Sequence, residues 1–280
     1  MDHINLALYS YGWDNQLSME EKLRLAHEMG YAGVEFAGGY GGVSAEDMKA
    51  MLAKYQLKAI SSHVGLAAIA ADLPYLQAIG AQFAIVPMHP FADHAETLEF
   101  AAQLNEVGKL AAQYGIKVGY HNHTQEFYVV DGKPLLDLLI ENTDPAYVGI
   151  ELDCGWATAA GIDAAAYISK YAGRFFAIHV KENSKVTGVE KPRSAHEKQP
   201  EWKIGPDGKP IIPPEVMAHF AELMKLNVPT GQGIVDWKAV RAAAEAQGCK
   251  AFIVEREYSY DGKDRVDCLK EDIDWLKANV

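Results

Sequence analysis

Pairs of reactive side chains recur from residue 121 onward, and the members of each pair stand two residues apart in a β-prone run. Successive side chains of a strand point to opposite faces, so residues two apart share one face. The reactive pairs therefore face one way, while apolar neighbours such as Ile150 and Leu152 face the other. The pairs are His121 and His123, Glu151 and Asp153, His179 and Lys181, and Glu255 and Glu257, and Glu126 follows the first pair.

Carboxylates and imidazoles at the ends of four such runs indicate a divalent metal site. A charged group inside a packed interior is unfavourable unless it is paired or bound to a metal. One such residue alone is typical of a capping acid or an ion-pair partner, but repetition on four runs favours a shared ion. Mixed Glu, Asp and His ligands suit Mn²⁺, Co²⁺, Fe²⁺, Mg²⁺ or Zn²⁺.

The elements that would position these residues alternate between strands and helices. Runs rich in Phe, Ile, Val and Tyr are typical of strands, and amphipathic helical stretches fill the gaps between them. Helix-ending glycines precede several runs, as in EMGYAGVEF and AQGCKAFIV. The eight predicted strands are Ile4–Ser10, Ala32–Ala37, Leu57–His63, Phe83–Met88, Ile116–His123, Tyr147–Asp153, Phe175–Glu182 and Ala251–Glu257.

This repeated β–α order predicts a parallel sheet, and we favour an α/β fold in which it closes into a (β/α)₈ TIM barrel. A barrel places functional side chains at the C-terminal ends of its strands, where the reactive pairs lie. An open dinucleotide-binding sheet would carry GxGxxG after its first strand, and that motif is missing there. Barrels commonly reach 280 residues as one unit, so we predict a single domain over residues 1–280.

The composition limits which classes of partner and which cellular location we expect. A net charge of −12 repels phosphate backbones and anionic lipid, so we expect a small-molecule partner, with no nucleic acid and no membrane. The three cysteines, Cys154, Cys249 and Cys268, form no CxxC pair, and no stretch has the roughly 18 apolar residues of a membrane span. The N-terminal sequence lacks the features of a signal peptide, so a cytoplasmic location is expected.

A segment rich in Lys, Pro, Gly and His, from about 183 to 214, interrupts the alternation after the seventh predicted strand. It is too long for an ordinary βα loop. Because βα loops build the active-site face of a barrel, we interpret the segment as a lid or an interface arm. The alternatives are a solvated excursion without function, or a contact in a homo-oligomer.

Seven motifs lie in order along nearly the whole chain: LALYSYG, GYAGVEF, YHNHTQEF, ELDCGW, AIHVKE, GQGIVDW and IVEREY. They resemble the xylose isomerase-like barrels, in particular the sugar phosphate isomerase/epimerase group. The resemblance implies a metal held by Asp153, His179 and Glu255 on the last three strands. For the ligand after the fifth strand we expect Glu126, with His121 as the alternative. Mn²⁺ is the expected ion, and Mg²⁺, Co²⁺, Fe²⁺ or Zn²⁺ are alternatives.

The ligand chemistry suggests proton abstraction next to a carbonyl, because a metal that bridges the carbonyl and the adjacent hydroxyl stabilises the enediolate. Isomerisation returns the proton elsewhere, whereas dehydration expels the β-hydroxyl. Lys181 is expected either to neutralise the enediolate or to pair with Glu151. The candidate catalytic residues are Glu255, His121, His123 and Lys181, and the candidate substrate-binding residues are Trp13, Trp156, Glu151 and Glu257.

A metal-dependent sugar isomerase or epimerase that acts on a keto sugar or keto-polyol is the first hypothesis. Trp156 stands where sugar epimerases of the family commonly carry a substrate-contacting histidine. The YHNHxxEF and DxGW motifs resemble a subgroup that acts on keto sugars, inososes or 3-keto-glycosides. A lyase or dehydratase on the same site is therefore the alternative. Two further hypotheses are a phosphodiesterase like the abasic-site endonucleases, which the acidic composition disfavours, and a non-catalytic binding barrel.

Overall fold

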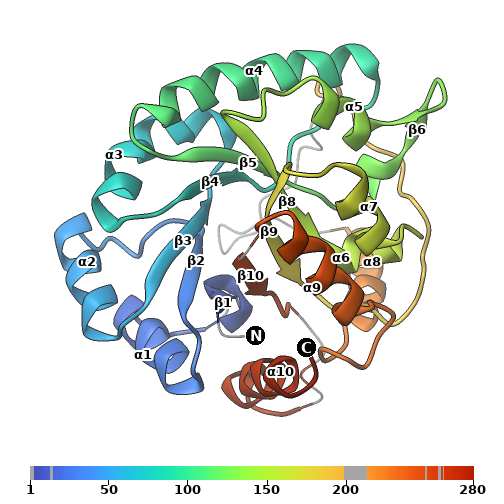
Figure 1. Cartoon of the computed structure of the whole chain (residues 1–280). Helices are drawn as coiled ribbons and strands as arrows, with labels where there is room; N and C mark the ends of the chain where they lie inside the picture. The colour runs from blue at the N-terminus through green and yellow to red at the C-terminus, as the bar shows by residue number, and fades with distance from the viewer. Residues whose placement is uncertain (1–2, 13–14, 199–212, 250, 258–259, 261) are drawn as a thin grey trace.

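The computed structural model describes residues 3–12, 15–198, 213–249, 251–257, 260 and 262–280. Eight parallel strands close into a barrel in the order β1-β10-β9-β8-β5-β4-β3-β2, and helices surround it (Figure 1). The predicted (β/α)₈ barrel is thus confirmed. The barrel strands are β1 (Ile4–Ala7), β2 (Gly33–Ala37), β3 (Lys58–His63), β4 (Phe83–Val86), β5 (Lys117–His121), β8 (Val148–Asp153), β9 (Phe175–Val180) and β10 (Ala251–Val254). A small hairpin, β6 (Val129–Val130) and β7 (Lys133–Pro134), follows β5.

Most of the α-helices begin at a side-chain cap, and α1 and α3 end at glycine. Ser18 and Glu21 form a reciprocal capping box at the start of α1, and Gly30 and Gly80 end α1 and α3 with φ of 90° and 80°. Only glycine adopts this left-handed conformation without steric penalty, as the sequence pattern predicted. The α-helices are α1 (Met19–Met29), α2 (Ala45–Lys54), α3 (Ile69–Ile79), α4 (His94–Ala112), α5 (Leu135–Glu141), α6 (Cys154–Ala159), α7 (Ala164–Lys170), α8 (Pro214–Leu226), α9 (Trp237–Ala246) and α10 (Arg265–Asn279).

Five of the eight barrel strands end earlier than the sequence predicted, whereas β2, β3 and β8 end where it predicted. β1 stops at Ala7 because Leu8–Tyr11 form a 3₁₀ turn, and β5 and β10 stop at His121 and Val254. Beyond these points the ladder pairing ends and the βα loops begin. Several reactive side chains therefore sit at strand ends or just past them, at the mouth of the barrel.

An apolar layer fills the N-terminal half of the barrel lumen. Phe176 from β9 stacks on Phe83 from β4 with a centroid distance of 4.0 Å. The Phe176 ring has room because Gly119 and Gly149, which pair across β5 and β8, carry no side chain. A Cβ atom at either glycine would lie 2.5 Å from that ring. The other buried members of the layer are Ala7, Ile60, Ala177 and Ile253. The buried acids and imidazoles lie nearer the C-terminal ends of the strands.

We expect Gly119→Val to destabilise the barrel by about 3 kcal/mol, the upper range for overpacking a filled core. The added side chain would overlap both Phe176 and the Ile85 Cδ1 atom, which would lie 2.8 Å from the new Cβ. The matched control is Gly65→Ala, because a Cβ at Gly65 meets no atom within 4 Å and its φ of −60° suits any residue. Urea unfolding of both variants checks the result, and equal midpoints would contradict it.

The described part of the inserted segment runs along the outside of the barrel rather than away from it. The backbone N–H groups of Thr187 and Gly188 donate to the Ala159 carbonyl at the end of α6, at 2.8 and 3.0 Å. Further along, the Ala195 N–H and the Ser194 hydroxyl donate to the carboxylate of Glu96 in the first turn of α4. The segment therefore links α6 to α4. Its residues 199–212 lie outside the described residues, and a lid or interface role stays a prediction.

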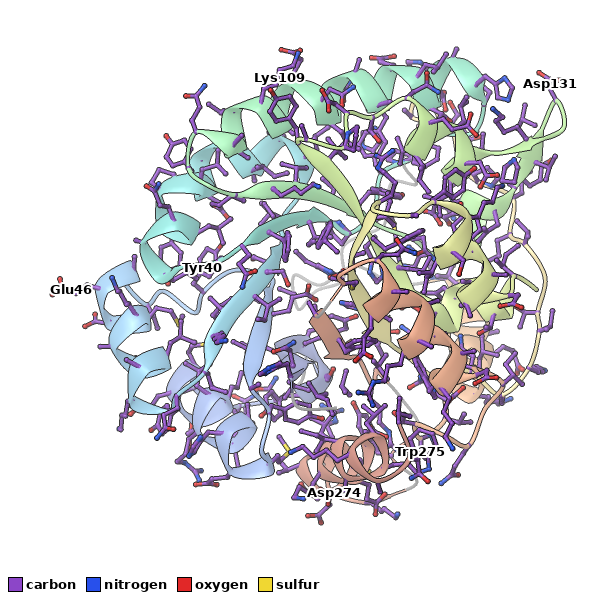
Figure 2. All side chains as sticks on the ribbon, viewed as in Figure 1. Tyr40, Glu46, Lys109, Asp131, Asp274 and Trp275 are labelled. Atoms are coloured by element: carbon purple, nitrogen blue, oxygen red, sulfur yellow. The ribbon has the colours of Figure 1, made fainter. Side chains whose placement is uncertain are left out.

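Charged side chains cover the outer helices. Glu46, Lys109 and Asp274 point away from the barrel in Figure 2, as expected for the solvent face of an amphipathic helix. Among the described residues, no helix is both long enough and apolar enough to cross a membrane.

Candidate metal centre

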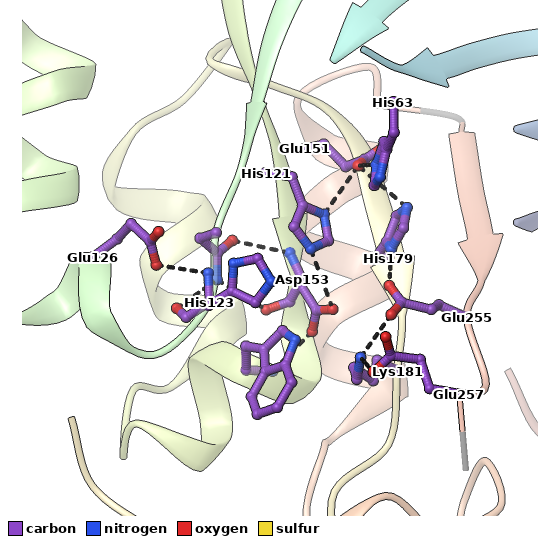
Figure 3. A network of polar contacts seen from close by, with 12 residues as sticks. His63, His121, His123, Glu126, Glu151, Asp153, His179, Lys181, Glu255 and Glu257 are labelled. Carbon is purple, nitrogen blue, oxygen red and sulfur yellow. Dashed lines mark hydrogen bonds and ion pairs between the residues drawn. The ribbon is translucent and has the colours of Figure 1, made fainter. Parts of the chain in front are cut away.

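Four buried side chains converge at the C-terminal end of the barrel. His121 at the end of β5, Asp153 at the end of β8, His179 on β9 and Glu255 just after β10 offer ligand atoms that lie within 4.8 Å of one another. β5, β8, β9 and β10 are consecutive neighbours in the barrel, so residues far apart in the sequence meet here. Figure 3 shows the four side chains pointing toward a common centre.

A second group of polar side chains lies against the same two imidazoles. His121 faces the Glu151 carboxylate with Nδ1, at 3.1 Å, and Asp153 with Nε2, at 3.8 Å. His179 faces Glu35 with Nε2, at 2.9 Å, and Glu255 with Nδ1, at 2.5 Å. Each imidazole thus turns one nitrogen toward Asp153 or Glu255 and the other toward a carboxylate on its opposite side.

This arrangement assigns the two groups different tasks. Metal-ligating histidines usually donate their other ring N–H to a carboxylate, which fixes the tautomer and the ring orientation. Glu151 and Glu35 are placed to accept those protons from His121 and His179. The other two ring nitrogens, His121 Nε2 and His179 Nδ1, then face Asp153 and Glu255, and His179 Nδ1 shares a hydrogen bond with the Glu255 carboxylate. We therefore take His121, Asp153, His179 and Glu255 as the set that could hold a divalent cation.

Unsatisfied acceptors support the fit of a cation. The Asp153 Oδ1 atom accepts a hydrogen bond from the Trp156 N–H at 2.8 Å and caps α6, but its buried Oδ2 atom accepts none. The buried Oε1 atom of Glu151 also lacks a hydrogen-bond partner. Buried polar atoms are nearly always paired, and an orphaned one costs about 1–3 kcal/mol. A cation beside Asp153 would remove part of that penalty.

The pKa values of the cluster also favour a bound cation. Burial raises the pKa of Asp153 to about 8, although Lys181 opposes the shift. Burial and the nearby Glu35 raise the pKa of Glu151 to about 7. Burial alone would lower the pKa of His179, but Glu151 and Glu35 outweigh it and hold the pKa well above its usual value. Protons thus hold part of the positive charge that these acids require, and a dication can replace them.

Lys181 stands beside the four candidate ligands. Its Nζ atom donates to Glu255 Oε1 and to Glu257 Oε2, both at 2.6 Å, and lies 4.7 Å from the ring centroid of Trp156. The expected pairing with Glu151 is therefore wrong, because the side chain turns toward the β10 end instead. The ammonium remains next to the ligand set.

His123 and Trp156 form a second polar pair at the mouth. Their ring centroids are 5.8 Å apart, and the buried atoms His123 Nδ1 and Trp156 Nε1 have no hydrogen-bond partner. Burial, and then repulsion by Lys181, lowers the pKa of His123 to about 4, so its imidazole is neutral at pH 7. The Trp156 N–H donor and one ring nitrogen of His123 are thus available to a bound molecule.

Glu126, which we expected as the ligand after the fifth strand, lies outside the cluster. Its carboxylate accepts hydrogen bonds from the Tyr120 hydroxyl at 2.8 Å and from the His123 N–H at 2.6 Å. The 3₁₀ turn Gln125–Phe127 folds it back against β5, and the position is taken by the alternative, His121. Trp13, one of the expected substrate-binding residues, lies outside the described residues.

Sequence reasoning missed two residues that complete the site. Glu35 on β2 binds His179 and Ser61, and His63 at the end of β3 contacts Glu151 at 2.9 Å. The same alternation rule could have found Glu35, because this buried acid lies between Val34 and Phe36, which face the helices.

We expect one equivalent of Mn²⁺ to stabilise the folded protein. An ion at about 100 times its Kd stabilises by roughly 2.7 kcal/mol, which corresponds to a rise in Tm of roughly 5–10 °C for a chain of this size. Thermal unfolding after EDTA treatment, with and without added Mn²⁺, measures the shift. A Tm unchanged by Mn²⁺, Co²⁺, Zn²⁺ and Mg²⁺ alike would contradict the metal assignment.

Comparisons with known proteins agree with this geometry. A family model described as "Xylose isomerase-like TIM barrel" matches residues 23–279. Among curated proteins, an inosose dehydratase of Lactiplantibacillus plantarum is 33% identical over 93 residues, 33% of this chain and 30% of that protein. An inosose dehydratase of Halalkalibacterium halodurans is 30% identical over 127 residues, 40% of this chain and 41% of that protein. The chain thus aligns with less than half the length of these relatives.

Solved structures share the fold over nearly the whole chain. A sugar phosphate isomerase/epimerase from Parabacteroides distasonis superposes with a TM-score of 0.76 and 22% identity, covering 99% of this chain and 98% of that one. A probable 3-DHS dehydratase from Bacillus anthracis gives 0.70 and 14%, covering 99% and 100%. The IolI protein with a bound zinc atom gives 0.70 and 11%, covering 99% and 97%. At these identities the likeness establishes the fold.

Proposed function

Because the chain belongs to the xylose isomerase-like TIM barrel family, we propose that it is a divalent-metal-dependent enzyme that removes a proton next to the carbonyl of a keto sugar or keto-polyol. The observation that carries the proposal is the buried set of His121, Asp153, His179 and Glu255, whose Asp153 Oδ2 atom has no hydrogen-bond partner. A bound divalent cation, which we propose is Mn²⁺, would polarise the carbonyl and stabilise negative charge on the substrate oxygens.

The side chains around the ligand set divide the remaining tasks. The neutral imidazole of His123, with its unpartnered Nδ1 atom, is the proposed base that takes the proton. The Lys181 ammonium, held by Glu255 and Glu257, offers positive charge where an oxygen becomes negative. Trp156 presents its Nε1 donor to a substrate hydroxyl and its ring to the apolar face of the sugar.

We propose dehydration as the overall reaction. Elimination of water needs one group that accepts a proton and another that assists the departing hydroxyl, and the unlike pair of His123 and Lys181 matches that need. The partial similarity to proteins named inosose dehydratase supports the same outcome. The proposed substrate is thus a small keto-polyol of the inosose type or a related keto sugar.

Isomerisation or epimerisation is the second candidate. It is supported by the superposition with a sugar phosphate isomerase/epimerase over nearly the whole chain. It requires a second group able to return the proton, and Glu255 is the acid beside the ligand set that would do so. The first chemical step is the same in both reactions, so one experiment can test that step and separate the outcomes.

The test is incubation of the Mn²⁺-loaded protein with an inosose and with a ketohexose in D₂O, followed by NMR. Exchange of the proton next to the carbonyl, with loss of water and growth of a vinylic signal, supports dehydration. Exchange with a new epimer or isomer supports the second candidate. A metal-loaded protein that exchanges no such proton across a broad panel of keto sugars and keto-polyols contradicts both.

A further inference from the structure

His63, the last residue of β3, contacts both carboxylates that face the metal-ligating imidazoles. Its Nε2 atom lies 2.9 Å from Glu151 Oε2 and 3.2 Å from Glu35 Oε1. β4 and β5 separate β3 from β8, so the contact with Glu151 crosses the barrel lumen. The His63 side chain is only 8% exposed, so water competes little for these contacts. Figure 3 shows His63 facing Glu151 and His179 from outside the candidate ligand set.

His63 and His179 hold the two carboxylates between them. His179 Nε2 faces the same two oxygen atoms, at 2.9 Å from Glu35 Oε1 and 3.2 Å from Glu151 Oε2. The two imidazole rings are nearly parallel, with 5.4 Å between their centroids and 11° between their planes. Two ionised carboxylates that share one site repel each other. The N–H donor of His63 therefore offsets a repulsion that would otherwise push Glu35 and Glu151 apart.

The two carboxylates depend on His63 to different degrees. Glu35 has an independent support, because its Oε2 atom accepts a hydrogen bond from the Ser61 hydroxyl at 2.7 Å. Among the described residues, the Oε1 atom of Glu151 has no hydrogen-bond partner. Its Oε2 atom faces His63, His121 and His179. Since the last two are candidate metal ligands, His63 is the contact outside that set that can fix Glu151.

His63 could instead be a metal ligand itself, because it offers a nitrogen within 4.8 Å of ligand atoms on His121, Glu151 and His179. An ion there would use His121 Nδ1, the nitrogen that faces Glu151. An ion in the candidate ligand set would use His121 Nε2, the nitrogen that faces Asp153. The two placements leave the His121 proton on opposite nitrogens, so they can be told apart.

We propose that His63 is a positioning residue for the metal centre: its Nε2–H donor holds Glu151 against His121 Nδ1, so that His121 Nε2 is presented to the ion. The inference rests on the proposed function, because it presupposes a divalent ion in the candidate ligand set. His63 would act through Glu151 on His121, whereas His179 would keep its orientation through Glu35 and the Ser61 hydroxyl.

Calorimetric titration with Zn²⁺ tests the proposal on three variants. We expect His63→Leu to lower Zn²⁺ affinity by about 10–100-fold, the usual loss when an outer partner of a metal ligand is removed. His63→Gln keeps an N–H donor near the position of Nε2, so its affinity should stay within about 3-fold of the unmodified protein, below that range. The matched control is His89→Leu, because His89 is another half-buried histidine that stacks on Phe100 at 4.0 Å, and its affinity should be unchanged.

NMR of the ¹⁵N-labelled imidazoles in the Zn²⁺-loaded protein supplies a readout that a general loss of stability would not produce. In the unmodified protein we expect the His121 proton on Nδ1. In His63→Leu that proton should exchange with water faster, because Glu151 no longer holds its place, while the Nε2 proton of His179 should exchange at its original rate.

The positioning role is overturned if a folded His63→Leu variant binds Zn²⁺ within about 3-fold of the unmodified protein, outside the range for an outer partner. It is also overturned if His63→Gln is as weak as His63→Leu, or if the His121 proton lies on Nε2, which would make His63 a ligand. His63→Asn, whose amide is too short to reach both carboxylates, replaces His63→Leu if circular dichroism shows that variant to be unfolded.

These measurements need no substrate, so they separate the positioning role from the proposed reaction. If the variants behave as expected while no keto compound exchanges its proton, the positioning role stands and the proposed reaction fails. If the unmodified protein reacts and His63→Leu keeps its Zn²⁺ affinity, the reaction stands and the positioning role fails.

Discussion

Asp153→Asn is expected to abolish metal binding while leaving the fold intact. The Oδ1 atom of Asp153 caps α6 through the Trp156 N–H, and an asparagine oxygen can keep that bond. The Oδ2 atom, which accepts no hydrogen bond, becomes an NH₂ group that cannot bind a cation. Burial holds the pKa of Asp153 at about 8, so the metal-free protein carries a neutral group here at pH 7 before and after the substitution.

We expect Mn²⁺ affinity to fall by at least about 100-fold, beyond what loss of an outer-shell contact produces, and kcat/KM to fall by at least about 1,000-fold, a loss of about 4 kcal/mol of transition-state stabilisation. Calorimetric titration and thermal unfolding of the metal-free form measure the two properties separately.

The matched control is Glu126→Gln, another carboxylate-to-amide change at a buried residue. Glu126 binds Tyr120 and the His123 N–H and lies outside the ligand set, so Mn²⁺ affinity should change less than about 3-fold, or about 0.6 kcal/mol. If Glu126→Gln loses the metal and Asp153→Asn keeps it, the ligand set derived from the structure is wrong, and our sequence-based expectation for Glu126 is restored.

The alternation of side chains along a strand predicted those site residues that stand two apart on the same strand. Glu151 and Asp153, or His179 and Lys181, share a face whatever barrel they belong to, because that relation depends only on the period of an extended chain. The structure brings Asp153, His179 and Glu255 together with His121 because their strands are neighbours in the barrel and parallel strands end at one edge.

The parts that sequence did not predict depend on geometry beyond one strand. Glu126 lies past the end of β5, where a 3₁₀ turn replaces the two-residue period, so alternation no longer says where its side chain points. Glu35 and His63 approach His179 and Glu151 only because the barrel closes, and a single acid or histidine on a strand carries no signal of its own partner. Strand-by-strand reasoning therefore found candidate ligands but not the carboxylates placed to orient them.

The barrel lumen is layered, with an apolar layer of phenylalanine rings below the layer of carboxylates and imidazoles. The stacked Phe83 and Phe176 rings exclude water from below, and their fit depends on Gly119 and Gly149. Glu35 and Glu151 hold the imidazoles in the middle, and Asp153 and Glu255 lie on the side of the imidazoles that the ion would occupy. An apolar floor raises the strength of each charge interaction above it, which favours a cation among so many buried acids.

His123→Gln should separate the base from the metal ligands. His123 lies outside the candidate ligand set, and its hydrogen bond to Glu126 is made by the backbone N–H, which glutamine keeps. The variant should therefore fold and bind Mn²⁺ as the unmodified protein does. Because glutamine cannot take up a proton, kcat should fall by about 10²–10⁴-fold, the usual contribution of a positioned base.

Exchange of the substrate proton with D₂O reports on this step directly and should fall by the same factor as kcat. Trp156→Phe is the companion variant, since it keeps an aromatic ring beside His123 and Lys181 but removes the unpartnered Nε1 donor. We expect it to raise KM more than it lowers kcat, because its contact exists in the bound substrate as well as in the transition state. If His123→Gln retained proton exchange within about 10-fold of the original rate, a loss too small for a general base, the base would have to be Glu255 or Lys181, and the unlike pair on which dehydration was proposed would no longer exist.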